Sequence, residues 1–278
     1  LIDGTYSGKL FQVGFKGSET IDVTIDSAKT TSIGAYNLHS ESFLGSGANA
    51  HAITATTMTL KGYLGSTTVT VNESATNVNS SAERMAADIN AVKELTGIGA
   101  NAVTKALISA VGTTGTMSFT LIGDKPRAGD EATASNFTVS AEISDLKDLN
   151  PLITAINNQS ANTGITATIG ASAASAILTH STGEDIEIKG LLIGGNTTGT
   201  MVMTTLDKYG NNLSAADDTL FRTLATGAED SLVIGNASGT AIVVGQMTLT
   251  SVKSFTVSGD HATDESGYFD KLNVTGGD

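Results

Sequence analysis

The sequence predicts a β-rich α+β protein made of several small domains in a row. Two of these domains are repeated helix-on-sheet units, and the row is joined to a basal β-hairpin. Three observations predict this class. Short alternating runs rich in Thr, Val and Ile are separated by Gly and Asn, as in strands and turns. Two segments repeat at an offset of 67 residues, from Ile89 to Ile156. Each repeat contains one amphipathic helical pattern.

The basal hairpin is predicted within residues 1–38. Apolar and polar residues alternate on both sides of a polar turn at 16–18, which places one face of each strand inward. We expect this inward face to form a core or a subunit contact. The candidate hairpin residues are Phe11, Val13, Gly14, Ile21, Val23 and Ile25.

The first repeat is predicted within an outer domain at 39–125. Ser80 and Glu83 have the spacing of a capping box at a helix N-terminus. Three apolar residues then recur at helical spacing, and Gly97 is placed to end the helix in the left-handed conformation. The core residues expected from this helix are Met85, Ile89 and Val92.

The second repeat is predicted within residues 126–200. Asn150 is a suitable N-cap and Pro151 suits the first helical position, while Gly164 is placed to end the helix. The dipeptide Ile-Asn, the tripeptide Thr-Gly-Ile and a later Gly all recur at the 67-residue offset. The same offset aligns Leu121 with Ile188. The core residues expected from this copy are Ile153, Ile156, Ile186 and Ile188.

The remaining stretch, 201–278, is predicted to hold a short helix at 214–225 and strands that return toward the domain next to the hairpin. Ser214 is a suitable cap for that helix and Gly227 a suitable stop. Alternating apolar runs follow from Leu232 to Val257.

Composition excludes several classes of function. Cysteine is absent, so thiol catalysis, thiolate metal sites and disulfides are excluded. The net charge of −13 and the small number of arginines disfavour a nucleic-acid-binding face. The sequence has no apolar run of the roughly 18 residues that a spanning helix needs, so no membrane insertion is expected. No basic n-region precedes an apolar stretch, so no signal peptide is predicted.

No catalytic, cofactor-binding or metal-binding residue is predicted, and we do not expect an enzyme. None of the four histidines lies in a His-Glu-x-x-His pattern, and no Gly-x-Ser-x-Gly motif is present. The acids between Asp260 and Glu265 could supply oxygen ligands to calcium, but their spacing fits a solvated turn better.

Two motifs resemble bacterial flagellins. The run Phe11-Gln12-Val13-Gly14, with its lead-in at 1–8 and the strand that follows, resembles the β-hairpin of the domain next to the flagellar core. The repeated helix with its Thr-Gly-Ile turn resembles the insert motif of the variable outer region in flagellins and in some hook-associated proteins. The closing segment 179–188 fits that motif in the second copy.

The resemblance implies a structural subunit of the bacterial flagellar filament that serves motility and surface display. It implies an extracellular location, other flagellin subunits as partners, and possible O-linked glycans on exposed Ser and Thr. It also implies long terminal helices that are missing from this stretch, which we therefore expect to be the outer domains. Two alternatives stay open. One is a hook-associated flagellar protein. The other is a carbohydrate-binding or adhesive surface module, which the low aromatic content of 5% disfavours.

Overall fold

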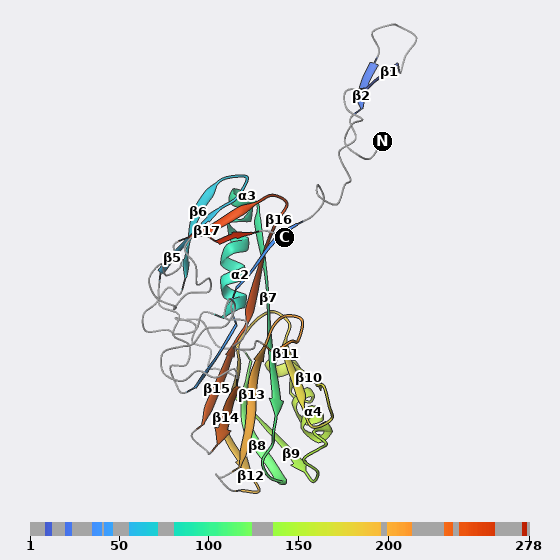
Figure 1. The fold of residues 1–278 in the computed structure, drawn as a ribbon, viewed down its shortest axis with the longest axis vertical. Coiled ribbons are helices and arrows are strands. Elements are labelled where there is room, and N and C mark those ends of the chain that lie inside the picture. The colour runs from blue at the N-terminus through green and yellow to red at the C-terminus, as the bar shows by residue number, and fades with distance from the viewer. Residues whose placement is uncertain are drawn as a thin grey trace.

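The fold was analysed in a computed structural model, which shows a β-rich α+β architecture of antiparallel sheets (Figure 1). The structure describes residues 9–12, 20–23, 35–40, 42–46, 56–71, 81–123, 136–195, 199–212, 231–235, 239–258 and 274–276. The predicted helix at 214–225, the charged stretch at 124–131 and the acids at 260–265 lie outside these residues.

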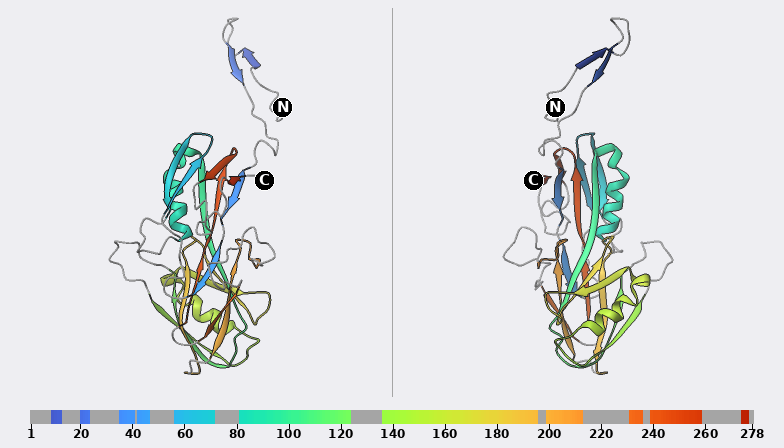
Figure 2. Two further views of the ribbon diagram at one scale, coloured as in Figure 1. Left: turned by 60° about the vertical axis from the view of Figure 1, so that its left-hand side comes forward. Right: turned by 90° about the vertical axis from the view of Figure 1, so that its right-hand side faces the viewer.

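The N-terminal hairpin pairs β1 (Lys9–Gln12) with β2 (Thr20–Val23) in antiparallel register. Phe11 lies opposite Ile21 and Lys9 lies opposite Val23, so these four positions share one face of the hairpin. Figure 2 shows this hairpin beyond one end of the main body.

The part of the body next to the hairpin is here called the first unit. Its outer sheet has the order β18-β17-β5-β6, with β5 (Thr56–Lys61), β6 (Ser66–Val71), β17 (Phe255–Ser258) and β18 (Val274–Gly276). Helices α2 (Ala82–Ala91) and α3 (Lys93–Thr96) follow β6 and lead into the long strand β7 (Ile98–Ser109). The N-terminal half of β7 pairs with β16 (Gln246–Ser251), which also pairs with β3 (Tyr36–His39).

The second unit is a sandwich of two larger sheets with one helix against them. One sheet has the order β4-β15-β12-β8-β9, with β4 (Phe43–Ser46), β8 (Gly115–Ile122), β9 (Phe137–Ile143), β12 (Ile186–Ile193) and β15 (Thr240–Val244). The other contains the C-terminal half of β7 with β10 (Ile165–Ile169), β11 (Ala176–His180), β13 (Thr200–Leu206) and β14 (Ser231–Gly235). Helix α4 (Asn150–Asn157) and the short α5 (Ser160–Thr163) lie between β9 and β10 in sequence.

Each unit has its own apolar core. In the first unit, Met85 and Ile89 of α2 are buried with Phe255 of β17 and Leu249 of β16. In the second unit, Ile153 and Ile156 of α4 are buried with the inward residues of both sheets. Strand β7 runs through both units, as Figure 1 shows, and is therefore the element they share.

The two units repeat one hydrogen-bonding pattern between helix and strand. Asn90 Nδ2 donates to the carbonyl oxygen of Ala100 at 2.8 Å, and its Oδ1 accepts from the Ala100 amide at 2.9 Å. Asn157 makes the same two bonds to Ala167, at 2.9 and 2.8 Å. Both asparagines therefore satisfy a strand edge that no neighbouring strand covers at that residue.

The turn that ends each helical segment is repeated as well. The Thr96 and Thr163 hydroxyls each donate to the carbonyl four residues earlier and accept from the amide two residues later. Gly97 and Gly164 follow with φ of 76° and 69°, a conformation that favours glycine. The 67-residue offset thus marks equivalent structure from Ile89 to Ala100 and from Ile156 to Ala167.

Beyond that point the sequence alignment is wrong. Leu121 and Ile188, which the offset aligns as equivalents, are directly paired in the adjacent strands β8 and β12. The structural equivalent of β8 is β5, because each strand is followed by a glycine that packs on an equivalent carbonyl. A side chain at Gly62, after β5, would overlap the Thr96 carbonyl, and a side chain at Gly123, after β8, would overlap the Thr163 carbonyl. The equivalent of β12 is β17, because each pairs antiparallel with that first strand.

These equivalences show that the repeated part of the second unit is nested in sequence within the first unit. The first unit runs through β5, β6, α2, α3 and half of β7, and resumes at β16 and β17. The repeated part of the second unit runs through β8, β9, α4, α5, β10, β11 and β12, which lie between those two parts in sequence. The body is therefore one unit interrupted by a copy of itself, whereas the sequence predicted successive segments bounded at 39–125, 126–200 and 201–278.

The predicted helix starts need two corrections. Ser81, rather than Ser80, is the N-cap of α2, and its Oγ accepts from the Arg84 amide at 3.3 Å. Asn150 is the first residue of α4 rather than its cap, and its amide donates to Asp148 Oδ1 at 3.0 Å. For α2, two adjacent serines of equal capping strength make a shift of one residue hard to exclude from sequence.

Candidate functional site

The predicted core residues of the repeats lie inside the two units and take no part in a surface site. Met85 and Ile89 are buried in the first unit, and Val92 is half-buried against the same core. Four more are buried in the second unit: Ile153, Ile156, Ile186 and Ile188. Of the hairpin residues, Phe11, Ile21 and Val23 lie in β1 and β2, while Val13, Gly14 and Ile25 fall outside the described residues.

Most of the exposed large apolar side chains in the described part of the chain lie at the end of the first unit that is nearest the hairpin (Figures 1 and 2). These four are Tyr63 and Leu64 in the β5–β6 turn, Leu95 in α3, and Val252 after β16. They are 45%, 54%, 60% and 63% exposed. These are four of the seven large apolar side chains that are exposed in the described part of the chain. We call this group the end surface.

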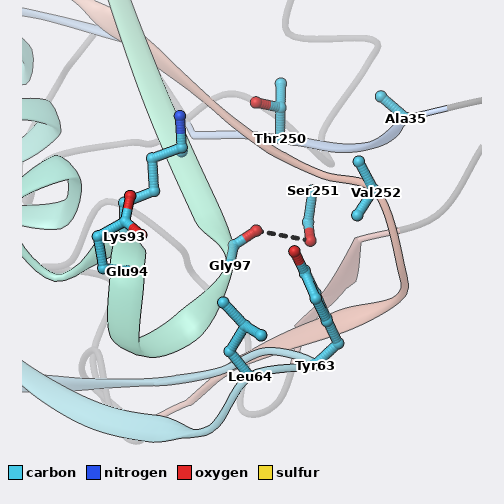
Figure 3. Close-up of a pocket in the computed structure, with 10 residues that line it drawn as sticks. Ala35, Tyr63, Leu64, Lys93, Glu94, Gly97, Thr250, Ser251 and Val252 are labelled. Carbon is cyan, nitrogen blue, oxygen red and sulfur yellow. Dashed lines mark hydrogen bonds between the residues drawn. The ribbon is translucent and has the colours of Figure 1, made fainter.

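A shallow hollow of about 290 Å³ opens within the end surface, and Figure 3 shows its lining. Tyr63 and Val252 lie on one side of it and Lys93 on the other. The Ser251 hydroxyl donates to the Gly97 carbonyl at 2.9 Å and fixes the floor of the hollow. A side chain at Gly97 would overlap the Tyr63 ring, so glycine is required there by contact as well as by φ.

The charges around the hollow are mixed. Lys93 and Glu94 both line it, and the Lys253 ammonium lies 5.8 Å from the centre of the Tyr63 ring. A lysine at that distance interacts favourably with the face of an aromatic ring. An apolar patch with a polar rim of both signs is typical of a protein–protein contact rather than of a catalytic cleft.

The corresponding end of the second unit is covered. His180 of β11 is paired with Ile165 in the second unit, and Ser251 of β16 is paired with Ile98 in the first unit. His180 is therefore the equivalent of Ser251, which lines the hollow. His180 is buried and packs on Gly164, the equivalent of Gly97. The following turn, 181–185, contacts the first turn of α2, where the Glu83 amide donates to the Gly183 carbonyl at 3.1 Å. The same end is therefore used for docking in one copy and is exposed in the other.

The histidines and the acids are the titratable side chains that are candidates for chemistry. Among the residues described, no group of three or more His, Asp or Glu is arranged to hold a metal ion. His39 bonds through Nδ1 to the Thr248 hydroxyl at 3.0 Å, and burial, followed by the positive charge of Lys208, lowers its pKa. His51 and His261 lie outside the described residues. None of the described helices is both long and apolar enough to span a membrane.

Sequence reasoning did not find the end surface. Its four apolar residues lie in three segments that are separate in sequence, namely the β5–β6 turn, α3 and the turn after β16, so no local pattern links them. The local signal that the sequence offers is a pair of apolar residues, Tyr63-Leu64, flanked by Gly62 and Gly65. Comparison with known proteins gives no family assignment: no family model matches the chain, and no curated protein matches it.

Proposed function

We propose that this chain forms the outer domains of a structural subunit of the bacterial flagellar filament. The proposal starts from the resemblance of the hairpin at 11–14 and of the repeated helix and Thr-Gly-Ile turn to flagellins. The two nested units would project from the filament and determine its surface. Other flagellin subunits would be the partners, and exposed Ser and Thr would be possible sites for O-linked glycans.

The observation that carries the proposal is the position of the end surface. Strand β3, which continues from the hairpin side of the chain, begins at Tyr36 beside Ala35 in the lining of the hollow. Strand β18 reaches the same unit through β17. Both approaches to the body thus lie in the unit that carries the exposed apolar side chains, which suits a body attached by one end.

The composition and the described residues also suit a structural role. Among the described residues, four of the seven exposed large apolar side chains lie together at one end of the first unit. Assembly needs only complementary surfaces, whereas catalysis needs convergent reactive groups.

The proposal is tested on filaments sheared from cells that carry the gene. We expect mass spectrometry to find peptides of this chain as a major component of the purified filaments. Recovery in only a few copies per filament would instead favour the hook-associated alternative. Absence from filaments together with binding on a glycan array would favour the adhesive module.

A further inference from the structure

Equivalent surface positions of the two units differ in chemistry. Asn162 is the equivalent of Leu95 at the 67-residue offset, and both are exposed. Ser181, the first residue after β11, is the equivalent of Val252, the first residue after β16, and both are again exposed. The unit therefore folds with polar residues at these positions, so Leu95 and Val252 are not needed for its core. Grouped apolar residues that folding does not need indicate a contact surface.

The turn after each of these strands differs in burial. Between β11 and β12, Gly183, Glu184 and Asp185 are buried, and the Glu83 amide at the start of α2 donates to the Gly183 carbonyl. Between β16 and β17, residues 252–254 are all exposed. In the described part of the chain, the turn of the first unit thus lacks the helix start that covers the turn of the second.

The path of the shared strand indicates where such a helix start would come from. Strand β7 leaves the first unit, whose helix covers the turn 181–185, and then pairs with β11, with Thr104 opposite His180. Strand β3 has the same place beside β16, with Tyr36 opposite Ser251. By this relation, the helix that covers the end surface would belong to the domain from which β3 enters the first unit, on the side of the hairpin (Figure 2).

The described helices of a second copy of this chain do not offer a suitable start. The first turn of α2 is already in contact with the turn 181–185. The first residue of α4, Asn150, has an amide that donates to Asp148 Oδ1 at 3.0 Å, so its own chain caps this helix. Helices α3 and α5 have only four residues each. These observations favour another domain over a second copy.

The charges at the end surface define the chemistry of the partner. Lys93 and Glu94 line the hollow, and Lys253 lies over the Tyr63 ring beside it. These groups carry a net positive charge in a chain whose net charge is −13. Complementary charges across an interface favour the correct partner. Asp and Glu are stabilising in the first turn of a helix, so a helix start that carries one of them would suit both lysines.

We propose that the end surface docks the acidic first turn of a helix in the hairpin-side domain of the same subunit. The inference rests on the proposed function only for the existence of that domain. The turn 252–254 lies against this helix start as the turn 181–185 lies against α2. The apolar residues Tyr63, Leu95 and Val252 widen the contact beyond that of the second unit.

Photo-cross-linking from position 252 in the complete subunit tests the docking. p-Benzoylphenylalanine replaces Val252, and the same replacement of Ile169, a similarly exposed residue of β10, is the matched control. Mass spectrometry of mixed isotope-labelled and unlabelled subunits separates links within one subunit from links between copies. We expect one dominant link from position 252, within the subunit, to the first turn of a helix that carries Asp or Glu, and no such link from position 169. Links to another copy, to a strand or only to residues 35–276, or no link, would overturn the proposal.

A charge exchange tests the chemistry of the contact. Lys253→Glu should lower the yield of that cross-link about two- to fivefold, and replacing the acidic residue of the linked helix by Lys should restore it. Lys147→Glu, an exposed change just before α4, should leave the yield unchanged. A yield that Lys253→Glu does not lower would refute the acidic partner.

Recovery of the chain in purified filaments tests the proposed function separately. Filaments that contain the chain without the link to a helix start would leave the function standing and overturn the docking. The link in a protein that is absent from filaments would leave the docking standing and overturn the function.

Discussion

Replacement of Asn157 by alanine tests the repeated helix-to-strand bonds. The side chain donates to the Ala167 carbonyl and accepts from the Ala167 amide, at 2.9 and 2.8 Å. Strand β10 pairs only with β11 in the described structure, so the alanine variant leaves both backbone groups of the buried Ala167 without a protein partner.

The expected cost follows from those two bonds. A single net hydrogen bond contributes roughly 0.5–1.5 kcal/mol, and a buried group left unsatisfied costs about 1–3 kcal/mol. Water can reach the partly buried site and replace some of the loss, so we expect about 2 kcal/mol for Asn157→Ala. Asn90→Ala should cost a similar amount, because its two bonds to Ala100 have nearly the same lengths.

Urea unfolding followed by circular dichroism measures both variants against the wild type. Asn162→Ala is the matched control, since Asn162 is exposed and its side chain bonds only to Gln159 among the described contacts. Its change should stay within about 0.5 kcal/mol. If Asn90→Ala and Asn157→Ala were as mild as this control, the equivalence of the two units would lose its energetic basis.

Three further predictions concern the turns, the end surface and the capping of α2. Gly97→Ala should cost about 1 kcal/mol or more and should cost more than Gly210→Ala, because both glycines have a positive φ but only the change at Gly97 also displaces a neighbour, the Tyr63 ring. Thermal melting measures both variants, and equal melting temperatures would contradict the contact. The double variant Leu95→Glu with Val252→Glu, made in the complete subunit, should impair filament assembly but leave the chain folded. The control Ile169→Glu changes a similarly exposed residue of β10 and should assemble normally. Equal assembly of the double variant and the control would show that the end surface has no role in assembly. Ser81→Ala should destabilise the protein by about 1 kcal/mol and Ser80→Ala by much less; the reverse order in urea unfolding would restore Ser80 as the cap.

The sequence contained enough local information to predict the helix-on-sheet unit. The repeated Asn90 and Asn157, followed by Thr-Gly-Ile, placed equivalent helices and turns because their bonds span only ten residues. The β-rich class followed from the alternating Thr, Val and Ile runs.

The nesting could not be predicted, because it depends on pairing between strands that are distant in sequence. Ala100 of β7 pairs with Leu249 of β16, and the whole repeated part of the second unit lies between them in sequence. Alternation fixes which face of a strand is buried, but it does not identify the partner strand. The end surface and the buried Glu184 depend on the same long-range pairing, so neither was visible before the fold was known.

Immunogold electron microscopy tests most directly the proposal that this chain forms the outer part of a flagellar filament. Antibodies raised against the chain should label intact filaments along their whole length on cells that carry the gene. Labelling confined to the hook junction, or spread over the cell body with bare filaments, would contradict the proposal.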